Sequence, residues 1–166
     1  MSDDPVQTII ESDIGHLSFQ EYFVKHQSKP CIRNISFNGS TEASLSPELK
    51  TVIRDNGFKA IIVCPSNPYL SIDPILSIEE IKSFIESASI PVVAVSPIVD
   101  GKALRGPAAK IMHEMDIPVS VKSIAEHYHP LIDGLVIDHK DKIISSEIQS
   151  MGIEVQVTNT VMNHDS

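Results

Sequence analysis

The chain has 166 residues, of which 42% are hydrophobic, and a formal net charge of −9. This length accommodates one domain with a sizeable core, so we predict a single domain over residues 1–166. The acidic charge argues against a nucleic-acid partner, although a nucleotide can still be held by backbone N–H groups and a few local cations. Because no apolar run is long enough to span a bilayer, we expect a cytoplasmic protein with no membrane partner.

The first third of the chain combines short strand patterns with two helical ones. Strands are predicted over residues 6–11, 16–19 and 31–37, and the first two are joined by a hairpin-type turn over residues 12–15. Between the last two, aromatic side chains recur at helical spacing, which is more often typical of core than of a ligand platform: Phe19, Tyr22 and Phe23. A further helix is predicted to begin at Pro47, with Ser46 as its cap.

A polar segment precedes the first of these strands. Ser2, Asp3 and Asp4 place a hydroxyl and two adjacent carboxylates directly before Pro5. By itself such a segment is typical of a solvated turn.

The central apolar run, residues 60–64, is rich in β-branched residues and has no polar face. This pattern predicts a strand covered on both sides, as in a parallel sheet. The chain then leaves the strand in a stiffened loop that contains a hydroxyl, a carboxamide and two prolines: Pro65, Ser66, Asn67 and Pro68.

A second hydroxyl, Ser71, follows before a helix that we expect to begin near residues 73 or 74. Open α/β sheets bind ligands at the carboxyl ends of their strands, and the N–H groups of a helix start favour an anion. We therefore interpret this segment as a loop that binds a phosphate or a nucleotide. An ordinary loop capped by Ser71 or Asp73 is the alternative.

A second buried strand is predicted over residues 91–95, after an amphipathic helix over residues 78–87. It ends at Ser96 and Pro97, much as the first strand ends at a proline and a serine. Two strands that leave the sheet in this way indicate adjacent walls of one cleft.

Positive charge is concentrated just after this second strand. Lys102, Arg105 and Lys110 stand close to Gly106, where backbone can approach a ligand closely. Such a cluster suits a polyphosphate. Scattered surface cations around a helix start are the alternative.

The last part of the chain continues the alternation of strands and helices. Strands are predicted over residues 117–121, 135–138 and 153–157, and helices over residues 123–129 and 141–151. His127 and His129 have no third ligand of matching type nearby, so we expect no metal site there. Cys31 and Cys64 are interpreted as buried free thiols.

This alternation predicts an α/β fold with a doubly wound, mostly parallel sheet and helices on both faces, a Rossmann-like three-layer arrangement. Five segments, in this order and at about this spacing, resemble the 2-phospho-L-lactate transferase family: MSDDPV (1–6), LSFQEYFV (17–24), CPSNPYLSIDPIL (64–76), PVVAVSPIVDGKALRGPAAKIM (91–112) and AEHYHPLIDGLVID (125–138).

The resemblance implies a function in the biosynthesis of coenzyme F-420. Members transfer a phospholactyl group, or in some bacteria a phosphoenolpyruvate-derived group, from a guanosine diphosphate conjugate to the deazaflavin Fo, with release of GMP and assistance from Mg²⁺. A homodimer is expected. The resemblance makes Asp3 and Asp4 candidate catalytic residues near the metal or the acceptor, with no confident metal ligand in the chain.

The remaining candidates are assigned to the nucleotide donor by the same resemblance: Ser2, Pro65, Ser66, Asn67, Pro68, Ser71, Ser96, Pro97, Lys102, Arg105, Gly106 and Lys110. The resemblance also implies a partial domain, because the family's glycine-rich first half and its last helix have no counterpart here. An uncovered apolar edge or face, and hence self-association, is then expected.

One position departs from the family pattern, which reads Ser-Ile-Gly-Pro where this chain has Asp73 in place of the glycine. A carboxylate there can cap a helix, but it repels a phosphate at the same N–H groups. The alternative function is that of a regulatory protein of the same superfamily that binds nucleotide sugars without transferase activity.

Overall fold

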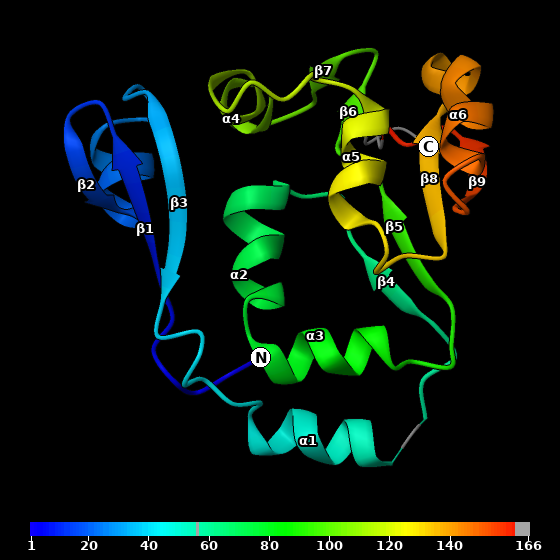
Figure 1. The fold of residues 1–166 in the computed structure, drawn as a ribbon, viewed down its shortest axis with the longest axis horizontal. Helices are drawn as coiled ribbons and strands as arrows, with labels where there is room; N and C mark the ends of the chain where they lie inside the picture. The colour runs from blue at the N-terminus through cyan, green and yellow to red at the C-terminus, as the bar shows by residue number, and fades with distance from the viewer. Residues whose placement is uncertain (56, 162–166) are drawn as a thin grey trace.

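The computed structural model describes residues 1–55 and 57–161, which form two sheets, a small hairpin and a set of short helices (Figure 1). The strands are β1 (Gln7–Ser12), β2 (Gly15–Ser18), β3 (Ile32–Asn38), β4 (Ile61–Val63), β5 (Val92–Val95), β6 (Ile98–Val99), β7 (Lys102–Ala103), β8 (Gly134–Asp138) and β9 (Glu154–Thr158).

The α-helices are α1 (Pro47–Arg54), α2 (Asp73–Leu76), α3 (Glu79–Glu86), α4 (Ala108–Glu114), α5 (Val121–Tyr128) and α6 (Ser145–Gln149). Two π-helical turns, η1 (Glu21–Lys25) and η2 (Pro68–Ile72), and a 3₁₀ segment, η3 (His139–Ile144), complete the elements. The predicted cap of α1 is confirmed, because the Ser46 hydroxyl accepts a hydrogen bond from the Leu49 N–H.

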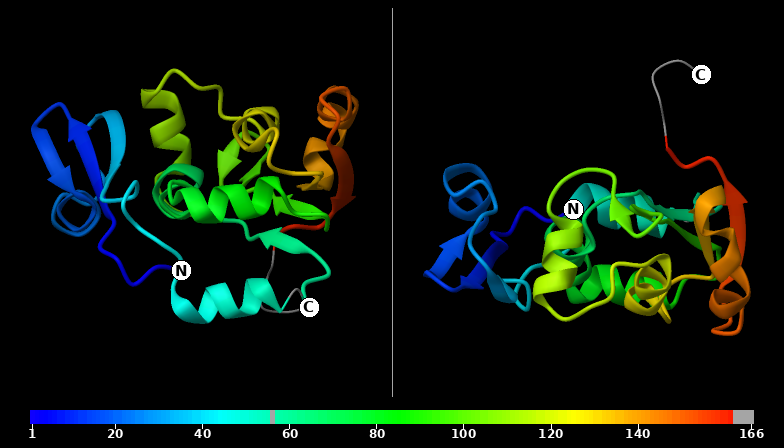
Figure 2. Two further views of the ribbon diagram at one scale, coloured as in Figure 1. Left: turned by 60° about the horizontal axis from the view of Figure 1, so that its bottom comes forward. Right: turned by 90° about the horizontal axis from the view of Figure 1, so that it is seen from above.

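The first three strands form a separate antiparallel sheet of order β2-β1-β3, which lies to one side of the parallel sheet with α2 between them (Figures 1 and 2). A turn of only two residues joins β1 to β2, and such a short connection permits antiparallel pairing alone. Ile10 and Tyr22 of this unit are fully buried and belong to the same core as the parallel sheet. The alternation of strands and helices predicted for this part of the chain therefore does not extend the parallel sheet.

The central sheet is parallel throughout, with the order β4-β5-β8-β9, which confirms the predicted α/β class. Because the strand order follows the chain order and crossovers are right-handed, α3, α5 and α6 lie on one face. Val92, Ala94, Leu135 and Ile137 point to that face and are almost fully buried.

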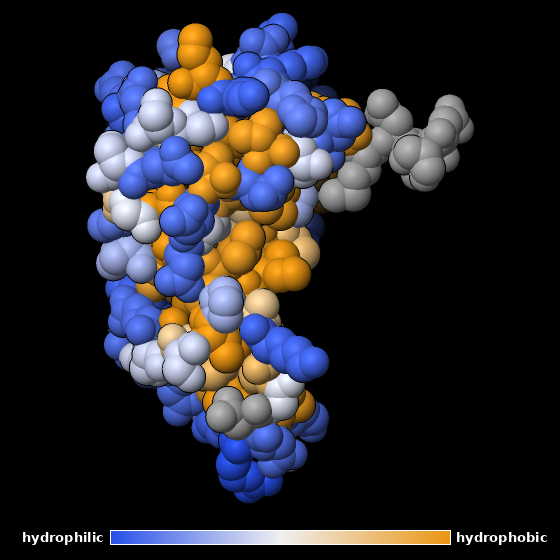
Figure 3. All heavy atoms as spheres, turned by 90° about the vertical axis from the view of Figure 1, so that its right-hand side faces the viewer, coloured by the Kyte–Doolittle hydropathy of each residue, from blue (hydrophilic) through white to orange (hydrophobic). Residues whose placement is uncertain are grey.

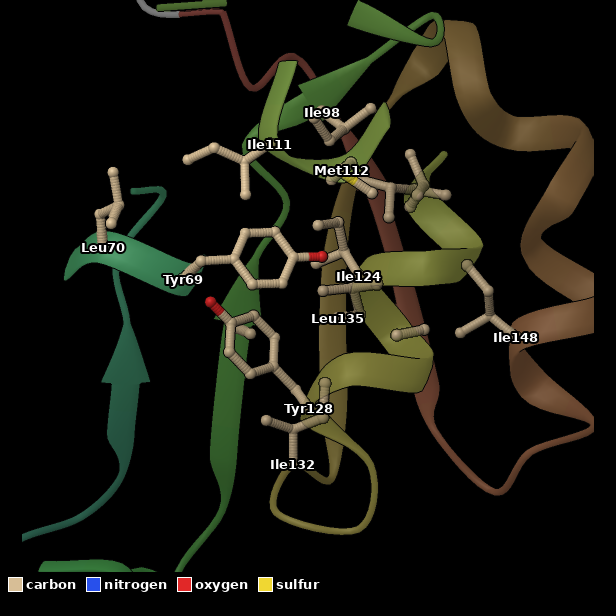
Figure 4. Packing of buried hydrophobic residues seen from close by; sticks show 14 of the residues in the cluster. Tyr69, Leu70, Ile98, Ile111, Met112, Ile124, Tyr128, Ile132, Leu135 and Ile148 are labelled. Carbon is tan, nitrogen blue, oxygen red and sulfur yellow. The ribbon is translucent and has the colours of Figure 1, made fainter. Parts of the chain in front are cut away.

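The core on this face is aromatic and aliphatic (Figure 4). Tyr69 and Tyr128 bring their rings together there, over side chains that include Ile124 and Leu135. The Tyr69 hydroxyl is buried without a hydrogen-bond partner among the described residues, and burial raises the pKa of Tyr69 to about 12. Both phenols are therefore neutral at physiological pH and act as core side chains.

The strand over residues 60–64 is not covered on both sides, which corrects the prediction. β4 is an edge strand, and Ile62 on the face opposite the helices is 65% exposed. Val93 and Val136 point to the same face and are only partly buried. Apolar side chains gather along a hollowed side of the molecule in Figure 3. An apolar run predicts burial correctly only when the fold supplies a neighbouring strand and a layer on each face.

Replacing Ile62 by lysine is expected to reduce self-association of the protein, because a charge on the exposed face opposes apolar contact between copies. The dissociation constant for self-association should rise about tenfold, as measured by sedimentation velocity over a concentration series. Val52→Lys is the matched control, since Val52 is 49% exposed on α1, away from the parallel sheet. Equal effects of both substitutions would show that net charge alone controls association.

Three smaller predictions are also corrected. No strand forms over residues 117–121; instead Val121 begins α5, whose cap is the Ser120 hydroxyl accepting from the Ser123 N–H. The helix predicted over residues 141–151 is divided between η3 and α6. Cys31 and Cys64 are free but exposed, because each stands at the end of a strand rather than within it.

Candidate functional site

A cavity of about 770 Å³ lies where β4, β5 and β9 end. Its walls come from the loops that follow these strands, from η1 of the antiparallel unit and from the segment that leads into α4. It is lined by Phe19, Phe23, Pro65, Ser66, Asn67, Leu70, Ser71, Ser96, Pro97, Leu104, Arg105, Gly106, Pro107, Ala108, Thr160 and Val161. The carboxyl ends of parallel strands are where open α/β sheets bind their ligands.

The loop after β4 is shaped by Asn67. Its Oδ1 accepts hydrogen bonds from the N–H groups of Tyr69 and Leu70, at 3.0 and 3.1 Å, and so caps η2. The helical segment therefore begins at Pro68, several residues before the predicted start, and its first N–H groups are occupied by the chain itself. The Asn67 Nδ2 is buried without a hydrogen-bond partner among the described residues.

Asp73 does not stand at the start of the helical segment. It follows η2 without a break, and its Oδ1 lies 2.8 Å from the Nε2 of His127 on α5. Asp73 is not among the residues that line the cavity. The expected repulsion between this carboxylate and a phosphate at a helix start thus has no structural basis, since Asn67 provides the cap.

The two serine-and-proline strand ends meet in this cavity. Ser66 lines it from the loop after β4 and Ser71 from η2, whereas Ser96 and Pro97 line it from the loop after β5. The Ser96 hydroxyl is committed to its own turn, because it donates to the Ile98 carbonyl and accepts from the Ile98 N–H. The hydroxyls of Ser66 and Ser71 form no hydrogen bond with any described residue, so both can contact a ligand.

The predicted cationic cluster is divided. Arg105 and Gly106 line the cavity, and Arg105 forms no ion pair with any described residue. Lys102 is exposed in the β6–β7 hairpin and lies outside the lining. Lys110 lines a neighbouring recess with Phe23, but its Nζ donates to the Pro30 carbonyl.

The N-terminal candidates lie elsewhere. Asp4 accepts hydrogen bonds from the N–H and the hydroxyl of Ser44, at 2.9 and 3.2 Å, and these bonds lower the pKa of the Asp4 carboxyl. Ser2 accepts from the Asp4 N–H, and neither of them nor Asp3 lines the cavity. Pro68, the first residue of η2, is buried and is also absent from the lining.

The described part of the cavity contains no set of side chains suited to bind Mg²⁺. The lining contains no carboxylate, and the described residues contain no group of three or more His, Cys, Asp or Glu side chains that could hold a metal ion. Carboxylate oxygens are the protein ligands that Mg²⁺ prefers. The Mg²⁺ implied by the resemblance therefore stays a prediction.

Sequence reasoning missed two walls of the cavity. The aromatic stripe was interpreted as core, but only Tyr22 is buried, whereas Phe23 is 44% exposed and lines the cavity with Phe19. Thr160 was not identified either, because its position depends on a contact with β8. The side chain of Asp138 accepts from both the N–H and the hydroxyl of Thr160, at 3.0 and 3.4 Å.

Replacing Asp138 by alanine is expected to detach this last segment from the cavity. The Asp138 Oδ1 also accepts a hydrogen bond from the Lys140 N–H, so the replacement removes the partners of two backbone N–H groups, those of Lys140 and Thr160. The free energy of unfolding should fall by about 2 kcal/mol, as measured by urea denaturation. Thr160→Val removes only the hydroxyl and should cost less than half as much. Equal losses for both variants would show that the backbone contacts of Asp138 contribute nothing.

No described helix is long and apolar enough to cross a membrane.

The sequence model of the family described as 2-phospho-L-lactate transferase CofD matches residues 1–165. Among curated relatives, the 2-phospho-L-lactate transferase of Methanococcoides burtonii is 36% identical over 162 residues, which cover 98% of this chain and 52% of the relative. The enzyme of the same name from Methanocaldococcus jannaschii is 37% identical over 98% of this chain and 51% of its own length.

Among solved structures, protein BH3568 from Bacillus halodurans shares the fold with a TM-score of 0.62 at 14% sequence identity. The match covers 99% of this chain and 55% of that protein. A second crystal structure of the same protein, described as a member of the UPF0052 family, matches with a TM-score of 0.60 at 13% identity. The chain thus spans about half the length of these curated relatives and of the solved protein that it matches.

Proposed function

We propose, for a chain that belongs to the 2-phospho-L-lactate transferase CofD family, that it provides the donor side of a phospholactyl transfer from a guanosine diphosphate conjugate to the deazaflavin Fo. The observation that carries the proposal is the convergence of Ser66, Ser71, Arg105 and Gly106 in one cavity at the ends of two parallel strands. Hydroxyls, a guanidinium and an open glycine backbone are groups that hold a diphosphate.

The chemistry proposed is a displacement at phosphorus. The terminal hydroxyl oxygen of Fo forms a new bond to the phosphorus that bears the lactyl group, and it loses its proton. The bond from that phosphorus to the bridging oxygen breaks, and GMP leaves with the electron pair. Catalysis of this kind depends on positioning and charge stabilisation, so the role of Arg105 is to balance negative charge on the diphosphate.

Several finer features belong to the proposal. The carried acid is lactate or a phosphoenolpyruvate-derived group, and the enzyme is a cytoplasmic homodimer. Asp3 and Asp4 remain candidate catalytic residues, although the geometry lends them no support, since neither lines the cavity.

The test is a calorimetric titration of the protein with GDP, with UDP and a UDP-sugar as matched ligands. Selective binding of GDP supports the proposal, and preferential binding of the UDP-sugar supports a nucleotide-sugar sensor instead. Ser66→Ala should weaken GDP binding about three- to tenfold, because it removes one hydrogen-bonding hydroxyl from the wall. The control is Ser87→Ala, an exposed serine at the end of α3 that lies outside the cavity. A folded protein that binds no nucleotide would contradict the proposal.

A further inference from the structure

Two phenylalanines form an exposed aromatic wall on one side of the cavity. The rings of Phe19 and Phe23 are stacked, with centroids 5.4 Å apart and planes inclined by only 18°. Phe23 nevertheless keeps 44% of its surface exposed, and it lines both the main cavity and the neighbouring recess. An aromatic side chain held in place by a stacked neighbour, but left open to a cavity, is suited to stack on a planar ligand.

The way in which this wall is built supports such a role. Phe23 belongs to η1, a π-helical turn, and such turns are frequent at functional sites. Tyr22 fixes the turn from the other side, because its side chain is fully buried and its hydroxyl donates to the Ser28 carbonyl. The ring of Phe23 is therefore presented to the cavity by a turn that is anchored in the core.

The chemistry of the cavity differs from one wall to another. The polar groups come from the strand ends and from the segment before α4, whereas η1 and the residues just before it contribute only the two phenyl rings. A guanine base needs polar partners along its edge, and these rings supply none. A larger planar ring system with an extended apolar face suits them better.

We propose that the Phe19–Phe23 wall binds the planar aromatic ring system of the acceptor, and that the guanine base of the donor lies elsewhere. The inference rests on the proposed function, in which the acceptor is the deazaflavin Fo. It adds a binding subsite on the antiparallel unit, opposite the strand ends that would hold the diphosphate.

The absence of tryptophan from this sequence gives a direct test. Phe23→Trp introduces a single tryptophan, whose emission should be quenched when Fo stacks on it. Val24→Trp is the matched control, because Val24 lies next in η1, is 65% exposed and is absent from the cavity lining. The fluorescence of this control should fall only by the inner-filter effect, that is, by the absorption of light by free Fo.

A second variant tests affinity. Phe23→Ser should weaken Fo binding about tenfold or more, while Phe23→Tyr retains it, and GDP affinity should stay within about twofold in both. Unchanged Fo affinity in Phe23→Ser, or quenching of Phe23→Trp by GDP rather than by Fo, would overturn the inference. If the wild-type protein binds GDP but not Fo, the inference fails and the proposed donor site stands. If it binds neither, both fail.

Discussion

Replacing Arg105 by alanine is expected to weaken GDP binding by about 10- to 100-fold. Arg105 is the cationic side chain of the cavity lining and pairs with no carboxylate among the described residues, so its charge is free to meet a diphosphate. Charge-assisted hydrogen bonds are worth about 1.5–3 kcal/mol, which corresponds to this range of affinity. The measurement is the dissociation constant from calorimetry at fixed ionic strength.

Two controls separate contact from general charge. Lys102→Ala removes a nearby cation in the β6–β7 hairpin that is exposed and outside the lining, and it should change affinity less than threefold. Arg105→Lys keeps the charge but loses the fork of N–H donors, so it should recover only part of the affinity. If Lys102→Ala and Arg105→Ala weaken binding equally, the effect comes from the overall field and not from a contact in the cavity.

Replacing Glu114 by alanine is expected to lower the free energy of unfolding by about 2–4 kcal/mol. The Glu114 carboxylate is largely buried, accepts from the Ile32 N–H at 3.0 Å and pairs with Lys110 on the same helix. Lys110 in turn donates to the Pro30 carbonyl at 2.8 Å. These contacts join α4 to the antiparallel sheet, so their loss should loosen the joint between the two. Urea denaturation measures the change.

The isosteric variant Glu114→Gln separates hydrogen bonding from charge. Burial tends to raise the pKa of Glu114, but the Ile32 N–H and Lys110 outweigh it and hold the pKa below its usual value of 4.5. A carboxyl whose pKa is lowered by folding stabilises the protein above pH 4.5, and that stability is lost as the pH falls through the folded pKa. Glu114→Gln should therefore flatten the acid limb of the stability curve below pH 4.5. A limb as steep as that of the wild-type protein would contradict this account.

Much of the parallel sheet was predictable because its signals are local. The strands over residues 91–95 and 135–138 were identified from uninterrupted apolar runs, and the helix from Pro47 was identified from its cap. The hairpin-type turn between the first two strands was predicted correctly, but the formation of a separate antiparallel sheet with the third strand was not. Apolar alternation indicates a strand, but it does not tell which sheet the strand joins.

In the candidate site too, the features with local sequence signals were predicted, and those that depend on distant contacts were missed. The loop over residues 65–71 and the segment at Arg105 were found because prolines, serines and a glycine mark the end of a strand or the start of a helix in the sequence itself. Phe23 and Thr160 were missed because their roles depend on neighbours far along the chain. A helical stripe of three aromatics does not show which one faces the solvent, and no local pattern predicts that Asp138 holds Thr160.

The cavity has a further consequence, because its walls come both from the antiparallel unit and from the loops at the ends of the parallel strands. A ligand that contacts both Phe23 and the strand ends would bridge the antiparallel unit and the parallel sheet, and would therefore stabilise the arrangement in which both contacts exist. Ligand affinity and the association of the antiparallel unit with the parallel sheet are then thermodynamically linked, so a change in one changes the other. Glu114 contacts no ligand in the proposed arrangement, yet its replacement should weaken ligand binding. Saturating ligand should in turn restore part of the free energy of unfolding that the replacement removes.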